Sequence, residues 1–154
     1  MVDNYALSYH EILTKVNNAK DKPKKLEVLR RYDTKELRSF LKGAFDPNLV
    51  WLLPEGKPPY TPNDAPIGTE HTWLKQEVKR MFHFLQGGNT ELSQSKRDNM
   101  FIQMLEGLSA EEADLLIKAK DKALNKEYKG LTGNLVKEAF DWDDSFMRKN
   151  STIH

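Results

Sequence analysis

The chain has 154 residues, a formal net charge of +1 and no cysteine. This length suits a single domain, and 38% hydrophobic with 10% aromatic residues argues against a disordered chain. The absence of cysteine excludes disulfides, Cys-ligated zinc and thiol catalysis, and the near-neutral charge does not indicate a strongly basic nucleic-acid binder.

Two helices are predicted at the start of the chain. Ser8 and Glu11 form a capping-box pattern, in which each residue satisfies a free amide of the first helical turn. The apolar residues that follow fall on one helical face, and this helix should end near Ala19. Asp21 is placed to cap a second helix, with Pro23 tolerated in its first turn.

A third predicted helix has the clearest amphipathic pattern in this part of the chain. Asp33 and Glu36 form a capping pair in front of it. Its apolar residues then recur at the spacing of one helical face: Leu37, Phe40, Leu41, Ala44 and Phe45. The helix should stop before Pro47, because the residue that precedes a proline is pushed out of the α region.

A proline-rich connection follows over about residues 46–69, which hold six of the seven prolines. The stretch PYTP (59–62) fits PxxP, a weak pattern for polyproline docking. Either the large side chains of this connection hold it on the protein's own core, or they are presented to a partner. We predict that Trp51, Leu52 and Leu53 point inward and that Tyr60 packs over the junction between the helices before and after the connection. The residues predicted to be exposed are Lys57 and Asp64.

Further helices are predicted after the connection. One runs from near Thr72 to the glycines at 87–88, with an apolar face formed by Leu74, Val78, Met81, Phe82 and Leu85. The next begins around Ser93 or Ser95. A capping box of Ser109 with Glu112 starts another, which fades near Asn125. A last short helix contains the apolar residues Leu135, Val136, Ala139 and Phe140.

The fold class predicted from these patterns is all-α, because no stretch alternates in the manner of a strand. We expect one domain over residues 1–154 with about six or seven short helices. Its helical halves, at about 8–45 and 70–140, are joined by the long ordered proline-rich connection. The ends, 1–7 and 148–154, are expected to be flexible.

The sequence contains no recognisable catalytic or metal-binding motif. His71 stands beside Glu70, but adjacent helical residues do not face each other, and we interpret this stretch as a helix N-terminus capped by Thr69. Three carboxylates lack the glycine turn and distal glutamate of an EF-hand and are interpreted as a solvated loop: Asp141, Asp143 and Asp144. We therefore predict no enzymatic activity, no metal site and no cofactor.

Residues 15–31 form a basic segment with seven Lys/Arg and two acids, a local balance of 7 − 2 = +5. Clustered cations of this kind contact phosphates, although ordinary solvated helix faces carry as much lysine. The candidate nucleic-acid contacts are Lys20, Lys22, Lys24, Lys25, Arg30 and Arg31.

The C-terminal stretch FDWDDSFMRK (140–149) combines acidic and aromatic residues. Such a segment either docks into an apolar groove of a partner or folds back on its own domain. Together with the proline-rich connection it supplies the candidate partner-binding residues, which are Trp51, Leu53, Tyr60, Phe140, Trp142 and Phe146.

Three stretches carry a resemblance to known proteins: LKGAFDPNLVWLLPEGKPPYTPN (41–63), NMFIQMLEGL (99–108) and YKGLTGNLVKEAFDWDDSFM (128–147). Over about residues 8–148 the chain resembles a family of small uncharacterised proteins of T4-like tailed phages and cyanophages. That family is a domain of unknown function, so the resemblance implies no catalytic or binding residues. It implies a viral origin, expression in the bacterial cytoplasm and a role as an accessory factor or minor virion component.

We therefore predict a non-enzymatic phage accessory protein that acts by binding a host or phage protein in the host bacterial cytoplasm. One alternative is a nucleic-acid-binding accessory factor that uses residues 15–31, and another is a minor structural component of the virion. No segment approaches the roughly 18 apolar residues of a membrane span. The N-terminus also lacks the basic start and apolar run of a signal peptide.

Overall fold

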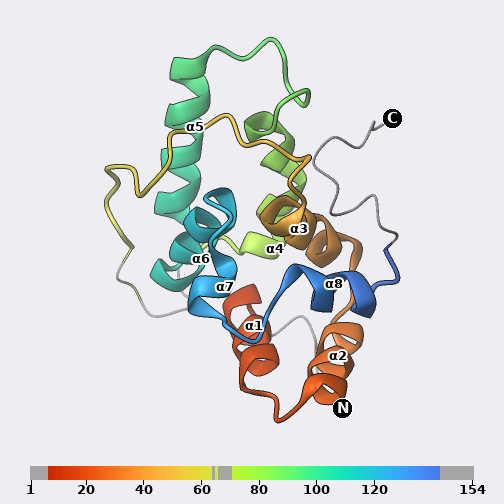
Figure 1. Cartoon of the computed structure of the whole chain (residues 1–154). Helices are drawn as coiled ribbons and strands as arrows, with labels where there is room; N and C mark the ends of the chain where they lie inside the picture. Colours follow the sequence, from red (N-terminus) through yellow and green to blue (C-terminus); the bar gives the residue numbers. More distant parts are fainter. Residues whose placement is uncertain (1–6, 64, 66–70, 143–154) are drawn as a thin grey trace.

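The computed structural model describes residues 7–63, 65 and 71–142, and these residues confirm the all-α prediction as a single helical domain (Figure 1). The helices are α1 Tyr9–Asn18, α2 Lys22–Arg31, α3 Lys35–Phe45, α4 Leu74–Glu77, the 3₁₀ helix η2 Val78–Phe84, α5 Gln94–Gly107, α6 Ala110–Lys120, α7 Leu124–Glu127 and α8 Gly133–Ala139. The ends predicted to be flexible lie outside the described residues, apart from residue 7.

Helix α6 forms the centre of the core. It packs against α1, α3, α5 and α7, so both predicted halves of the chain contribute to one core (Figure 1). Because it is covered on several sides, most of its side chains are buried: Glu112, Ala113, Leu115, Leu116, Ile117, Ala119 and Lys120. Two of these are ionisable, and each binds backbone groups of segments distant in the sequence.

The helix starts follow the predicted capping patterns, with one correction. Ser8 and Glu11 form both bonds of a capping box at α1. At α3, however, the cap is Thr34 and not Asp33, because the Thr34 hydroxyl accepts from the amide three residues further on. Asp33 instead receives two hydrogen bonds of 2.7 Å from the guanidinium of Arg38.

The capping pattern at α6 is only half formed, and the glutamate has another function. The Ser109 hydroxyl accepts from the amide of Glu112, as predicted. The Glu112 carboxylate accepts from the amide of Tyr9 at 3.1 Å and from the amide of Leu74 at 2.9 Å. These two residues begin α1 and α4, so one carboxylate links the first turns of three helices. The positive ends of the helix dipoles favour a negative charge there.

Burial of Glu112 makes its contribution to stability depend on pH. Burial raises the pKa of its carboxyl above the ordinary 4.5, and the hydrogen bonds from Leu74 and Tyr9 oppose the rise. A carboxyl with a raised pKa binds more protons when folded, so its contribution is complete below the ordinary pKa and is lost as pH rises through the raised one. We expect the unfolding free energy of the natural chain to fall relative to Glu112→Gln as pH rises above 4.5. Urea titrations at several pH values measure the unfolding free energies of both proteins. A natural chain that became more stable relative to Glu112→Gln as pH rose would contradict this expectation.

The predicted helix after the proline-rich connection is split into α4 and η2, and its buried face differs from the prediction. Val78, Met81 and Phe84 are buried, whereas Phe82 is 47% exposed. The buried residues are spaced by three, which is the period of a 3₁₀ helix. Phe84 packs edge-on against Phe101 of α5, with ring centroids 5.3 Å apart. Assigning Phe82 to the buried face was therefore wrong.

One further helix end differs from its prediction, and one predicted helix start lies outside the described residues. The predicted helix that fades near Asn125 ends at Lys120, because Lys122 adopts a left-handed backbone with φ of 56° before α7 begins. The predicted cap Thr69 lies outside the described residues. Helix α4 follows Trp73, which makes no side-chain cap, and Glu112 supplies the missing acceptor.

Candidate functional site

The first part of the proline-rich connection is held on the protein's own core by Trp51. This side chain is 8% exposed, and its indole Nε1 donates to the carbonyl of Gly43 on α3 at 2.9 Å. A Cβ at Gly43 would lie 3.2 Å from the indole, so glycine permits this close approach. The next amide, of Leu52, donates to the carbonyl of Phe84 at 2.7 Å. The start of the connection is thus held between α3 and η2.

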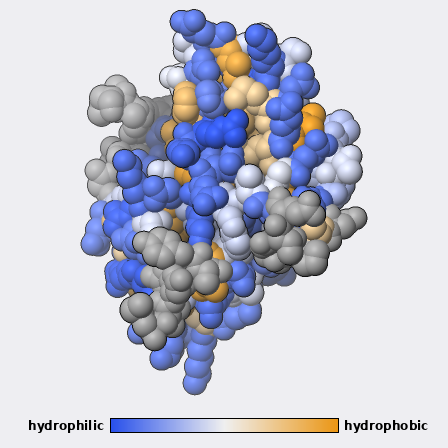
Figure 2. Space-filling view, turned by 180° about the vertical axis from the view of Figure 1, so that it is seen from behind, coloured by the Kyte–Doolittle hydropathy of each residue, from blue (hydrophilic) through white to orange (hydrophobic). Residues whose placement is uncertain are grey.

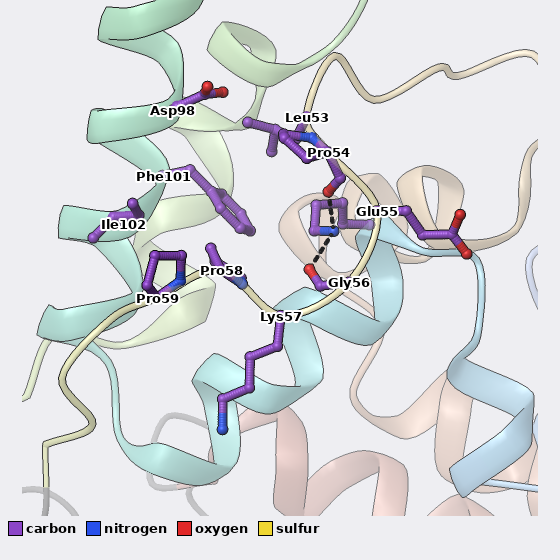
Figure 3. A pocket seen from close by; sticks show the side chains of 11 residues that line it. Leu53, Pro54, Glu55, Gly56, Lys57, Pro58, Pro59, Asp98, Phe101 and Ile102 are labelled. Carbon is purple, nitrogen blue, oxygen red and sulfur yellow. Dashed lines mark hydrogen bonds between the residues drawn. The ribbon is translucent and has the colours of Figure 1, made fainter.

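A buried lysine holds the next turn of the connection. The Lys120 side chain is 2% exposed, and its Nζ donates to the carbonyls of Pro54 at 2.8 Å and Gly56 at 3.0 Å (Figure 3). Its third partner is a carboxylate oxygen of Asp121 at 2.6 Å. Asp121 in turn accepts from the amide of Gly56. No motif in the sequence indicates these contacts of Lys120.

Replacing Lys120 by methionine should loosen this turn. The change removes the charge and leaves the carbonyls of Pro54 and Gly56 without their donor, so we expect a loss of about 2–3 kcal/mol in unfolding free energy. Urea denaturation measures the loss, and amide exchange of residues 55–57 should become faster. The matched control is Lys118→Met, which removes only partly exposed ion pairs and should cost below about 1 kcal/mol. Equal losses in the two variants would contradict the assignment.

A pocket of about 280 Å³ lies between the connection and α5. Phe101 points from α5 toward the loop, whereas Lys57 points away from Phe101 (Figure 3). Apolar groups from Leu53, Pro58 and neighbouring residues form most of the lining. Lys120 also lines the pocket, and its ammonium group already donates to three oxygen atoms. Pro54, Pro58 and Pro59 therefore line a pocket together with side chains of the protein's own α5.

The remaining candidates of the connection lie partly in contact with the core. Leu53 and Tyr60 are half-buried and pack against core side chains. Lys57 is exposed as predicted, and its Nζ lies 5.5 Å from the Tyr60 ring centroid. Burial raises the pKa of the Tyr60 phenol. Asp64 lies outside the described residues, so its predicted exposure stays a prediction.

The C-terminal aromatic candidates are divided between the core and its edge. Phe140 is buried, and the Arg38 guanidinium lies 4.8 Å from its ring centroid. Trp142 is half-buried, 5.3 Å from the Phe140 ring and 5.9 Å from the Nζ of Lys42. Phe146 lies outside the described residues. The described aromatics are therefore in contact with α3.

Several cations of the basic segment stabilise helix ends within the protein. Lys25 Nζ donates to three carbonyls at the C-terminal end of α1, at 2.9–3.1 Å. Arg30 donates to the carbonyls of Glu138 and Ala139 at the end of α8, and Lys22 pairs with the Glu138 carboxylate at 2.7 Å. Cations at helix C-termini complement the dipole. The other candidate side chains of this segment are exposed: Lys20, Lys24 and Arg31.

An open groove of about 400 Å³ lies between α3 and η2, and no pattern in the sequence indicates it. Its apolar residues are Leu49, Val78, Met81, Phe82 and Leu85, and its polar residues are Lys35, Glu36, Ser39, Lys42 and Lys79. We call this surface the α3–η2 groove. Val50 lies next to η2, because its carbonyl accepts from the amide of Gln86. Phe82 is 47% exposed and Val50 is 44% exposed.

These two residues are the large hydrophobic side chains that the described part of the chain leaves exposed. Seen from behind, apolar patches lie among hydrophilic side chains in the upper half of the molecule, the half that holds α5 and η2 (Figure 2). The groove lysines Lys35 and Lys79 form no ion pair with other described residues. The groove thus combines apolar surface with lysine side chains that form no ion pair within the described part of the chain.

The described residues contain no group of three or more His, Cys, Asp or Glu side chains placed to hold a metal ion. None of the described helices has both the length and the apolar character that crossing a membrane requires. Both ring nitrogens of His71 are buried without a hydrogen-bond partner in the described structure. Glu70, its neighbour in the sequence, lies outside the described residues, and the helix that follows this stretch begins at Leu74.

The fold and its surface define a small all-α domain with an open apolar groove between two helices. The model of a family of unknown function, DUF6433, matches residues 12–126, and the chain belongs to this family. The matched region runs from α1 into α7 and contains the whole α3–η2 groove, whereas α8 lies beyond it. No curated protein and no solved structure matches the chain.

Proposed function

We propose that this protein is a non-enzymatic accessory protein that binds another protein through the α3–η2 groove. The observation that carries the proposal is the exposure of Phe82, at 47%, within that groove. An exposed aromatic side chain among apolar groups is a frequent centre of protein–protein binding, and basic groups around it contribute to specificity.

The packing of the other aromatic candidates supports the groove over the proline-rich connection. Trp51 and Phe140 are buried in the protein's own core, so their surface is not available to a partner without local unfolding. Tyr60 is half-buried and belongs to the connection that Lys120 holds in place. Phe82, in contrast, is 47% exposed.

The resemblance to proteins of T4-like phages supports a viral origin, and with it a partner from the phage or its bacterial host. The protein then acts in the host cytoplasm. A place in the virion is the alternative, and mass spectrometry of purified particles distinguishes the two. Nucleic-acid binding through residues 15–31 is less well supported, because Lys25 and Arg30 are used at helix ends.

Replacing Phe82 by serine should weaken partner binding at least about tenfold, because the central apolar contact is lost. Tagged protein is captured from infected cells, and a stoichiometric partner of the natural chain should be missing with Phe82→Ser. The unfolding free energy should change by less than about 1 kcal/mol, because the side chain is exposed. The matched control is Gln103→Ser at an exposed position of α5. A partner retained equally by both variants would disprove binding through the groove.

A further inference from the structure

The described chain ends at the edge of the α3–η2 groove. The amide of Trp142 donates to the carbonyl of Lys137 at 3.0 Å, which fixes the backbone after α8. The Trp142 ring lies 5.9 Å from the Nζ of Lys42, and Lys42 is one of the residues that line the groove. The residues that follow Trp142 therefore start beside the groove.

The sequence of those residues complements the groove in charge and apolar character. Residues 143–148 are Asp-Asp-Ser-Phe-Met-Arg, so two carboxylates precede an aromatic and a second apolar side chain. The groove complements these residues, because three lysines surround apolar groups that include Phe82. Its one acid is Glu36, so positive charge prevails among the side chains that line it.

The segment is also long enough to follow the groove along α3. Lys42 and Lys35 are seven residues apart on this helix, which corresponds to about 10 Å along its axis. Six extended residues span about 20 Å. Residues 143–148 can therefore reach from Lys42 past Lys35 without any change in the described fold.

We propose that the α3–η2 groove takes an acidic–aromatic segment, and that residues 143–148 of this chain are its ligand in the free protein. The carboxylates contact the lysines of the groove, and Phe146 packs beside Phe82. A partner with the same chemistry then competes with this segment, a consequence that rests on the proposed function. The contact within the chain does not depend on any partner.

The absence of cysteine allows a direct test in the full-length protein. A single cysteine introduced by Asn150→Cys carries a spin label, and nuclear magnetic resonance measures the broadening of backbone amides. We expect broadening at Lys79 and Phe82 that is lost when Asp143, Asp144 and Phe146 are changed together to asparagine, asparagine and serine. No broadening at the groove, or broadening that survives this triple change, would overturn the proposal.

Mixed samples separate this chain's own segment from that of a second copy. Spin-labelled protein without isotope is mixed with isotope-labelled protein without the spin label. Broadening within one chain leaves the groove amides of the mixed sample sharp, whereas broadened amides would overturn the proposal in favour of a dimer.

The spin-label experiment and the capture experiment with Phe82→Ser can fail independently of each other. If Phe82→Ser loses a partner but the spin label does not affect the groove, the function stands and this inference fails. If the label broadens the groove but Phe82→Ser retains the partner, the inference stands and the proposed function fails. Where both hold, Phe146→Ser should strengthen partner binding several-fold, because the competing segment is weakened.

Discussion

Replacing Trp51 by alanine is expected to lower the free energy of unfolding by about 3–5 kcal/mol. The indole is buried between α3 and η2, and the backbone beside it pairs with Leu85 in an isolated antiparallel bridge. Alanine removes this apolar surface and leaves a cavity next to Gly43, which has no side chain of its own to fill it. Urea denaturation followed by far-ultraviolet circular dichroism measures the change.

The variant Trp51→Phe separates packing from hydrogen bonding. It keeps most of the apolar contact but removes the indole N–H, and the Gly43 carbonyl still accepts from Lys122 Nζ at 2.7 Å. Its loss should therefore be smaller than that of alanine, at about 1–2 kcal/mol. If Trp51→Ala cost less than about 1 kcal/mol, the side chain would not be a core residue and its earlier candidacy as a partner contact would gain support.

Replacing Glu112 by alanine should cost about 3 kcal/mol or more, because two buried amides lose their acceptor and each unpaired group costs about 1–3 kcal/mol. The affected amides are those of Tyr9 and Leu74, at the starts of α1 and α4. Urea denaturation measures the loss. Amide exchange should also become faster at both helix starts, although α6 itself keeps its Ser109 cap.

The matched control for this variant is Glu111→Ala. Glu111 stands in the same first turn of α6 and has the same charge, but its side chain is exposed. Its loss should stay below about 1 kcal/mol, the usual effect of an acid near a helix N-terminus. Similar losses for the two glutamates would show that general helix electrostatics, and not the two amide contacts, explain the effect.

The fold could be predicted from the sequence where the signals are local. Helices α1 to α3 follow from caps and apolar spacing within about ten residues, and a cap such as Ser8 acts on its own first turn. Helix η2 was missed because α and 3₁₀ spacing both include i and i+3. The regular interval of Val78, Met81 and Phe84 is the signal that distinguishes them.

The candidate site was less predictable, because it depends on how distant segments pack. The groove exists only when η2 lies against α3, and its centre depends on Phe82 facing out while Phe84 faces in. Likewise, a basic run gives no sign that Lys25 or Arg30 will bind the carbonyls of a neighbouring helix. Charge counts locate a surface, but tertiary contacts decide which of its charges remain available.

The position of Glu112 also has a consequence for the order of assembly. Its two amide partners lie 103 and 38 residues away along the chain, so long loops must close before either hydrogen bond forms. During synthesis α1 leaves the ribosome first, yet its first turn has no acceptor from Glu112 until that residue has emerged as well. We therefore expect the N-terminal helices to remain open to exchange on the nascent chain until α6 is available, and to become protected in one cooperative step.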